Sequence, residues 1–310
     1  MLITLSDECP IFSATAHADL HKFLSTIRSS RHILVRPAPE KLRGILAREV
    51  WDVYGDFITQ SYKRATNRGQ RLVYHNECTA CDPAKMSEFY ALPAVIVVEN
   101  ATTDGEWLKL IVEKLRAQLR WIFAGATPAL DVRQAGGVGE IPKELARTAA
   151  PRMSIRPKGN VPLGVIALCD SDARVPGAWS DSARAVVSTA SDVGASAHVL
   201  AKRTIENYVP IEALQAYSRT RTHTAAALLL LEGLSDVQHD HFPMKDGLAP
   251  ADLEASGSVF SCGGPMGVGF GDFMSDFLSR FRHHTAPRDL RRRDTANELE
   301  ELLTLIEECV

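Results

Sequence analysis

The sequence predicts an α/β protein built on a mostly parallel sheet with helices on both faces. Two runs, Ala94–Val98 and Leu163–Leu168, are continuously apolar and contain β-branched residues, as expected for strands that are buried on both faces. Helix-like and strand-like segments alternate around these runs, which is the pattern of parallel strands joined by crossover helices. An N-terminal α+β segment and a mainly helical C-terminal segment flank this central part.

The N-terminal segment, residues 1–92, mixes strand and helix patterns. Short strand-like runs occur at His32–Arg36 and Arg71–His75. Between them, apolar residues at three-to-four spacing predict one amphipathic helix with a buried stripe of Leu42, Leu46, Val50, Val53 and Phe57. The polar, proline-containing stretch Asn76–Pro93 indicates a boundary near residue 92.

The central segment, residues 93–210, carries the regular α/β alternation. After the first buried strand, Thr103 and Glu106 have the spacing of a capping box and start a predicted helix. Shorter strands are expected at Leu130–Arg133 and at Ala197–Leu200, the latter after a helix over Ser182–Val193. These elements together predict the parallel sheet.

The C-terminal segment, residues 211–310, is predicted to be mainly helical, with helices over Ile211–Tyr217, Thr222–Leu234 and Asn297–Glu308. Its glycine-rich run Gly263–Gly271 follows no clear strand and lacks the lysine of a phosphate-binding loop. We therefore interpret this run as a close-packed turn.

Composition and charge exclude several classes of protein. Among 310 residues, Lys and Arg number 35 against 38 Asp and Glu, and the resulting net charge of -3 argues against a histone-like protein that coats polyanions. No apolar run approaches the ~20 residues needed to span a bilayer, and Asp7 and Glu8 do not fit a signal peptide. With six cysteines and no export signal, we expect reduced thiols, a cytoplasmic location and no membrane partner.

Acidic side chains follow the three strands that we expect to lie side by side. Glu99 and Asp104 follow the first, Asp170 and Asp172 the second, and Glu206 the third. Sites form where the carboxyl ends of parallel strands meet their loops, so neighbouring strands would bring these carboxylates together. Such a cluster repels itself unless a cation such as Mg²⁺ or Mn²⁺ neutralises it. Helix capping and turn formation are the alternative roles, for Asp104 above all.

Four motifs, in this order, resemble a TOPRIM domain, the metal-binding fold of topoisomerases, bacterial primases and OLD-family nucleases. They are the segments Val97–Asn100 (VVEN), Ala135–Gly137 (AGG), Ala167–Asp172 (ALCDSD) and Arg203–Tyr208 (RTIENY). The last is similar to the IENY-type segment of OLD-like and antiviral-defence TOPRIM proteins. The resemblance spans about residues 94–210 and implies a TOPRIM-like central domain; Asn100 departs from the commoner V-E-G pattern.

The resemblance implies a nuclease that cleaves phosphodiester bonds of DNA or RNA with Mg²⁺ or Mn²⁺. Glu99, Asp170 and Asp172 would bind the metal, and Glu206 would be a ligand of a second ion. Because Lys202 and Arg203 lie beside this cluster in sequence, we expect one of them to offset charge on the phosphate.

The partners expected of such a nuclease follow from what the sequence lacks. No Walker A motif is present, so a sensor or ATPase would be a separate chain. The resemblance thus implies a toxin-like, partner-controlled effector of antiviral defence, with a homo-oligomer left open.

Two other functions are compatible with the sequence. A nucleotide-sugar transferase would use Asp170 and Asp172 as its Mn²⁺ motif, but it leaves Glu99 and the IENY segment unexplained. The protein could also be a non-catalytic subunit that binds a partner, with an acidic cluster that no longer has a catalytic role.

Three further features have both a functional and a structural interpretation. His75, Cys78 and Cys81 have the spacing of half a zinc site, with buried thiols as the alternative. The run His239–His241, followed by Lys245–Gly247, could line a substrate groove or donate a proton, or form a solvated loop. A group of arginines could contact nucleic acid or lie in solvent at the beginning of a helix: Arg288, Arg291, Arg292 and Arg293.

Overall fold

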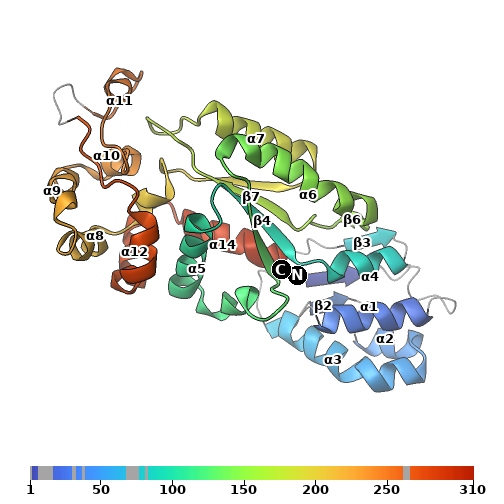
Figure 1. Cartoon of the computed structure of the whole chain (residues 1–310). Helices are drawn as coiled ribbons and strands as arrows, with labels where there is room; N and C mark the ends of the chain where they lie inside the picture. Colours follow the sequence, from blue (N-terminus) through green and yellow to red (C-terminus); the bar gives the residue numbers. More distant parts are fainter. Residues whose placement is uncertain are drawn as a thin grey trace.

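The central part of the computed structural model is a four-stranded sheet in which all strands run parallel (Figure 1). Its order is β5-β4-β7-β8, with bounds β4 Ala94–Val98, β5 Leu130–Gln134, β7 Val165–Cys169 and β8 Ser196–Val199. The structure describes residues 2–5, 17–29, 33–36, 39–67, 77–80, 83–260 and 266–310. The predicted α/β class is confirmed, and the three strands followed by acidic residues are neighbours.

Alternating side chains of the central strands pack into two hydrophobic cores on opposite faces of the sheet. Ile96 and Val98 contact the core that contains α5 (Thr103–Leu115) and α14 (Glu298–Cys309). Val95 and Val97 contact the core that contains α6 (Ile141–Ile155) and α7 (Asp181–Asp192). Because both faces are covered by helices, every residue of β4 and β7 is buried, which explains their continuous apolar sequence.

A second four-stranded sheet joins the N-terminal segment to the central one. Its order is β2-β1-β3-β6, with bounds β1 Leu2–Leu5, β2 Ile33–Arg36, β3 Glu77–Ala80 and β6 Lys158–Asn160. The helices of this part are α1 His17–Ser29, α2 Pro39–Ile45, α3 Arg48–Asn67 and α4 Pro83–Ala91. Since β6 comes from beyond residue 92, the N-terminal segment shares a sheet with the central segment.

The single amphipathic helix predicted near residue 50 is wrong, because two helices occupy this stretch. The chain leaves helical geometry at Leu46 and Ala47, between α2 and α3. After this break α3 buries Tyr54 and Ile58, whereas Val53 is 51 % exposed. The buried stripe keeps a four-residue spacing through Val50, Tyr54 and Ile58, so the predicted position Val53 lies beside it. The strand predicted at Arg71–His75 lies outside the described residues.

The capping box predicted at Thr103 and Glu106 is also wrong. The N-cap of α5 is Thr102, whose side chain makes no capping hydrogen bond. The beginning of this helix is instead held by Asp104, described with the site below.

The C-terminal segment is helical, as predicted, and most of its helices are short. They are α8 Ile211–Ser218, α9 Ala225–Glu232, α10 Asp236–His241, α11 Pro250–Glu254, α12 Met274–Arg280, α13 Pro287–Arg293 and α14. Helices α8 to α12 form a group beside the central sheet, and α14 returns to that sheet (Figure 1). No helix among the described residues is long and apolar enough to cross a membrane.

The described part of the glycine-rich run is a close-packed turn, as we interpreted it. The backbone N–H of Phe270 donates to the carbonyl oxygen of Met244 at 2.7 Å, and that of Gly271 donates to Lys245 at 2.9 Å. A Cβ atom on Gly269 would lie 2.5 Å from the backbone nitrogen of Gly247 and closer still to the carbonyl oxygen of Lys245. Glycine at position 269 therefore allows the two backbones to cross.

Gly269→Ala is expected to destabilise the protein by about 1–3 kcal/mol, because two backbone segments must separate to admit the methyl group. Urea unfolding monitored by circular dichroism measures the change. Gly139→Ala is the control, since no heavy atom lies within 4 Å of the position that its new methyl group would take; we expect a change within about 0.5 kcal/mol there. Equal stability of the two variants would contradict the crossing.

Candidate functional site

The structure places all the predicted acidic residues at the carboxyl edge of the central sheet. Glu99 follows β4 directly, and Asp170 and Asp172 follow β7. Glu206 lies in the 3₁₀-helix η5 (Ile205–Tyr208), which the loop after β8 leads into. Because β4, β7 and β8 are adjacent and parallel, their three loops emerge side by side.

Hydrogen bonds join the loop after β7 to the loop after β8. The Asp172 N–H donates to the carbonyl oxygen of Arg203 at 3.0 Å, and the Ser171 hydroxyl donates to that of Lys202 at 2.8 Å. The Ile205 N–H donates to Oδ1 of Asp170 at 3.1 Å. These contacts hold η5, and with it Glu206, against the Asp170 loop.

Asp172 has a backbone conformation that few residues other than glycine adopt. Its φ angle is 50°, in the left-handed region, and the residue is exposed. Ser171, by contrast, is completely buried. The loop therefore turns sharply and presents Asp172 to solvent at the cost of local strain, a feature that is concentrated at functional sites.

The carboxylates are close enough to oppose one another's ionisation. Burial raises the pKa of Asp170 well above its ordinary value, and the negative charge of Glu206 is the next cause, followed by Asp104, Asp172 and Glu99. Burial also raises the pKa of Glu99, with Asp104 and Asp172 as further causes. The pKa of Glu206 is raised as well, first by burial. The edge therefore carries a concentration of negative charge that is poorly compensated.

Asp104 adopts the turn-forming role that we considered as the alternative. Its carboxylate accepts hydrogen bonds from the Asn100 N–H at 2.9 Å and the Thr103 hydroxyl at 3.0 Å. It adds negative charge beside Glu99 while it holds the loop in place. The Gly136 N–H donates to the carbonyl oxygen of Glu99 at 3.1 Å, so the AGG turn after β5 supports the same loop.

Lys202 and Arg203 are both paired with carboxylates outside the cluster. Lys202 forms an ion pair with Asp240, and its side chain is 7 % exposed. Arg203 donates from Nη1 to Oδ1 of Asp252 at 2.7 Å. Since these two side chains are paired and only 7 % and 16 % exposed, we assign neither of them to a substrate phosphate.

Lys245 is a cation near the cluster that sequence reasoning did not assign to the phosphate. It is exposed, it forms an ion pair with Asp272, and its positive charge acts to lower the pKa of Glu206. The backbone crossing at Gly247 and Gly269 fixes its position. The only sequence signal was its place in the polar cluster after His241.

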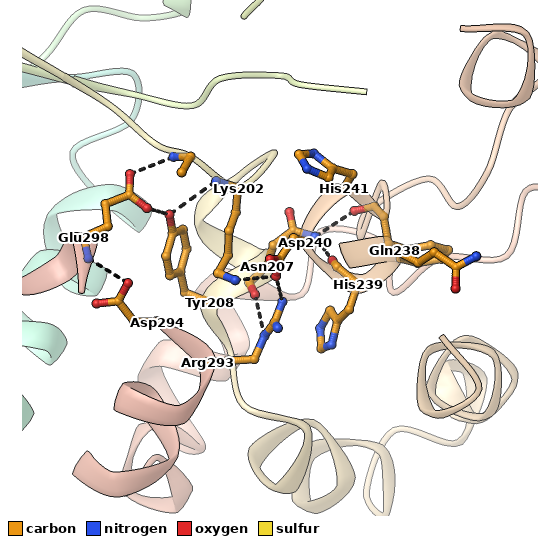
Figure 2. A network of polar contacts seen from close by, with 12 residues as sticks. Lys202, Asn207, Tyr208, Gln238, His239, Asp240, His241, Arg293, Asp294 and Glu298 are labelled. Atoms are coloured by element: carbon orange, nitrogen blue, oxygen red, sulfur yellow. Dashed lines mark hydrogen bonds and ion pairs between the residues drawn. The ribbon is translucent and has the colours of Figure 1, made fainter. Parts of the chain in front are cut away.

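A buried polar network lies behind η5 and explains the rest of the IENY segment (Figure 2). The Asn207 side-chain amide donates to the carbonyl oxygens of His239 at 2.7 Å and Phe242 at 2.9 Å. The Tyr208 hydroxyl donates to Glu298. Asn207 and Tyr208 thus anchor η5 to the buried network. Glu206, which precedes them in the chain, belongs to the acidic cluster.

The solvated-loop interpretation of the histidine run is wrong for both histidines, which are buried. Burial lowers the pKa of His239 to about 3, with the charges of Arg293 and Lys202 as further causes. Nδ1 of His241 lies 3.0 Å from the carbonyl oxygen of Ala173, and because a carbonyl only accepts, this nitrogen carries the hydrogen. Helix α10 therefore supports the Asp172 loop.

The arginine set of α13 is largely committed to ion pairs. Arg293 is buried and pairs with Asp240, and Arg292 pairs with Glu212. Arg293 also donates from Nε to the carbonyl oxygen of Asn207 at 3.0 Å. This helix therefore supports the loop after β8.

The chemistry of the donor set fits a hard divalent cation. Carboxylate oxygens are the ligands that Mg²⁺ and Mn²⁺ prefer, and a cation would relieve the mutual repulsion of Glu99, Asp170 and Glu206. Among the described residues, no three His, Cys, Asp or Glu side chains are already grouped closely enough to hold an ion. Binding would therefore require these carboxylates, and the exposed Asp172, to turn toward one another. The residues of the predicted half zinc site lie outside the part of the chain that the structure describes: they are His75, Cys81 and the side chain of Cys78.

No protein-family model matches this chain. No curated protein and no solved structure matches it either. The similarity to TOPRIM proteins therefore rests on the four motifs of the central segment.

Proposed function

We propose that this protein is a metal-dependent nuclease of the TOPRIM type, acting on DNA or RNA. One observation carries the proposal: carboxylates from the loops of three adjacent parallel strands are concentrated at one edge of the sheet, with their pKa values raised. Poorly compensated carboxylates reduce the stability of a fold, so their presence together favours a functional reason.

Glu99, Asp170 and Asp172 would hold the ion, and Glu206 would add a ligand for a second one. A bound Mg²⁺ or Mn²⁺ supplies positive charge to a phosphodiester and lowers the pKa of a water molecule. The hydrogen bond from Ile205 orients Asp170, and the left-handed turn at Asp172 presents its carboxylate to the open side. Lys245 would offset charge on a phosphate oxygen.

Control by a partner is a further part of the proposal. A separate sensor protein would hold the nuclease inactive until it is triggered, as in the partner-controlled effectors whose IENY segment this chain resembles. A toxin-like role in antiviral defence follows from the resemblance of the IENY segment.

The test is cleavage of plasmid DNA, single-stranded DNA and total RNA with Mg²⁺, Mn²⁺ or EDTA. We expect cutting that requires the metal and falls at least about a hundredfold in Glu99→Gln and in Asp172→Asn. Lys245→Gln should raise KM more than it lowers kcat, because the lysine would act on substrate charge. Asp192→Asn, an exposed residue at the end of α7, is the matched control and should retain full activity.

Full activity in both Glu99→Gln and Asp172→Asn would refute the assignment of these ligands. Binding of a sugar nucleotide without any cleavage would favour the transferase alternative. Failure to bind Mg²⁺ or Mn²⁺ at millimolar concentration, measured by calorimetry, would favour a non-catalytic subunit.

A further inference from the structure

The loop that follows the acidic motif of β7 carries an exposed tryptophan. Trp179 is 41 % exposed, whereas Trp107 is 1 % exposed. Within the part of the chain that the structure describes, Trp179 is the only exposed Trp, Phe or Tyr residue. Single exposed apolar side chains are common on protein surfaces, so the position of this one beside the acidic motif is the informative observation.

Backbone contacts place Trp179 beside the acidic motif. The Ser180 N–H donates to the carbonyl oxygen of Ser171 at 2.9 Å, and Ser171 stands between Asp170 and Asp172. The Ser180 hydroxyl in turn accepts a hydrogen bond from the Ala183 N–H at 3.1 Å and caps α7. The two ends of the loop are therefore joined, and the tryptophan is one residue away from the junction.

Two half-exposed arginines lie within five residues of Trp179 in the chain. Arg174, from the same loop, has a side chain that is 54 % exposed, and that of Arg184, from the first turn of α7, is 58 % exposed. The Arg184 guanidinium donates to the carbonyl oxygen of Trp179 and forms an ion pair with the exposed Asp181. Arg174 forms an ion pair with Asp252 at 3.7 Å. Both arginine side chains remain more than half exposed, so two accessible cations lie close to Trp179 in the chain.

The exposed tryptophan and its nearby arginines could bind either another protein or a single-stranded nucleic acid. Protein-binding hot spots also use Trp and Arg, but they cluster several such anchors in well-packed pockets at the centre of an interface. Trp179 instead has Ala178 and Ser180 as its chain neighbours and two arginines nearby, beside a cluster suited to a phosphate-binding metal. An aromatic face with adjacent positive charge is the recurring means of binding single-stranded nucleic acid.

We infer that Trp179 stacks on an unpaired base next to the cleaved phosphate, so that the substrate is single-stranded DNA or RNA rather than a duplex. This inference rests on the proposed nuclease function. In a duplex the faces of the bases are covered by neighbouring bases, and only an unpaired base offers a free face to a protein side chain. Arg174 and Arg184 would contact the flanking backbone phosphates.

The test measures binding separately from cleavage. Fluorescein-labelled oligonucleotides of about 12 nucleotides, as single-stranded DNA, single-stranded RNA and duplex DNA, are titrated with the full chain by fluorescence anisotropy, with Ca²⁺ in place of Mg²⁺. We expect Trp179→Ala to raise the Kd for single strands about 5- to 150-fold and to leave duplex binding unchanged, and Trp179→Phe to retain most of the affinity. The relative effects on the DNA and RNA strands identify the preferred substrate.

Quenching of intrinsic tryptophan fluorescence is a second measurement. It would not change if Trp179 had only a structural role. Single-stranded oligonucleotide should quench tryptophan emission of the natural protein and have much less effect on Trp179→Phe, because a stacked base quenches only the indole that it contacts. Val53→Ala is the matched control: it removes an exposed apolar side chain from α3, which lies at the opposite end of the molecule from α10 (Figure 1). This variant should bind as the natural protein does.

The outcomes separate this inference from the proposed function. Single-strand binding that depends on Trp179, without cleavage in Mg²⁺ or Mn²⁺, would support the inference and refute the nuclease. Metal-dependent cleavage with unchanged single-strand affinity in Trp179→Ala would overturn the inference alone. No binding of any oligonucleotide would also overturn it, as would an equal loss of duplex and single-strand affinity.

Discussion

Asp170→Asn is expected to abolish cleavage and, at the same time, to stabilise the metal-free protein. Loss of the negative charge removes a metal ligand, so activity should fall at least about a hundredfold. The asparagine keeps an oxygen that can accept the Ile205 hydrogen bond, so the loop should remain in place. Removing a charge that Glu206, Asp104, Asp172 and Glu99 all oppose should raise the free energy of unfolding by about 0.5–2 kcal/mol.

The pH dependence of this gain has a defined sign. The pKa of Asp170 is raised in the folded state, so folding favours its protonated form. The resulting penalty is absent below the ordinary pKa of an aspartate, near 3.8, and grows as the pH rises toward the folded-state pKa. The stability difference between Asp170→Asn and the natural protein should therefore be larger at about pH 8 than at about pH 5.

Thermal unfolding in EDTA, repeated with Mg²⁺ or Mn²⁺, measures both effects. The metal should raise the melting temperature of the natural protein and raise that of Asp170→Asn much less, because the variant has lost a ligand. Asp192→Asn serves again as the control for removal of an exposed charge. A metal-free Asp170→Asn protein less stable than the natural one would contradict the repulsion on which the site is argued.

Asp240→Ala is expected to destabilise the protein by about 3–5 kcal/mol. Asp240 forms ion pairs with both Lys202 and Arg293, whose side chains are 7 % and 10 % exposed (Figure 2). Without the carboxylate, two nearly buried cations face each other unpaired. Burial already lowers the pKa of Lys202, and the charge of Arg293 is the next cause.

Urea unfolding monitored by circular dichroism measures this loss, with Asp192→Ala as the control for an exposed aspartate, expected to change stability by less than about 0.5 kcal/mol. The double variant Asp240→Ala, Lys202→Met should recover part of the stability, since one unpaired cation is gone. If Asp240→Ala were as stable as Asp192→Ala, the network would not support the loop after β8 in the way we describe.

The elements that could be predicted from the sequence are those whose burial leaves a local pattern. β4 and β7 contact cores on both faces, so almost any residue other than an apolar one is excluded from them. The break between α2 and α3 leaves no such pattern, because the apolar spacing of Leu42, Leu46 and Val50 continues across it. A periodic sequence predicts the buried face of a helix but does not show where the helix stops.

The roles of charged residues were harder to predict. The pair Lys202 and Arg203 is next to Glu206 in sequence, yet their partners Asp240 and Asp252 lie 38 and 49 residues further along the chain. Trp179 gave no sequence signal, since an isolated tryptophan is usually a core residue. Its exposure follows from how the loop after β7 closes on itself.

The sequence by itself determined the α/β class and the positions of the acidic residues behind the strands, because strand burial and strand ends are local properties of the chain. Only the tertiary structure decided which carboxylates are left without a cation, which cations are already paired, and which aromatic side chain meets solvent. Electrostatic energies depend on distance in space and on burial, and neither can be read from the spacing of residues along a chain.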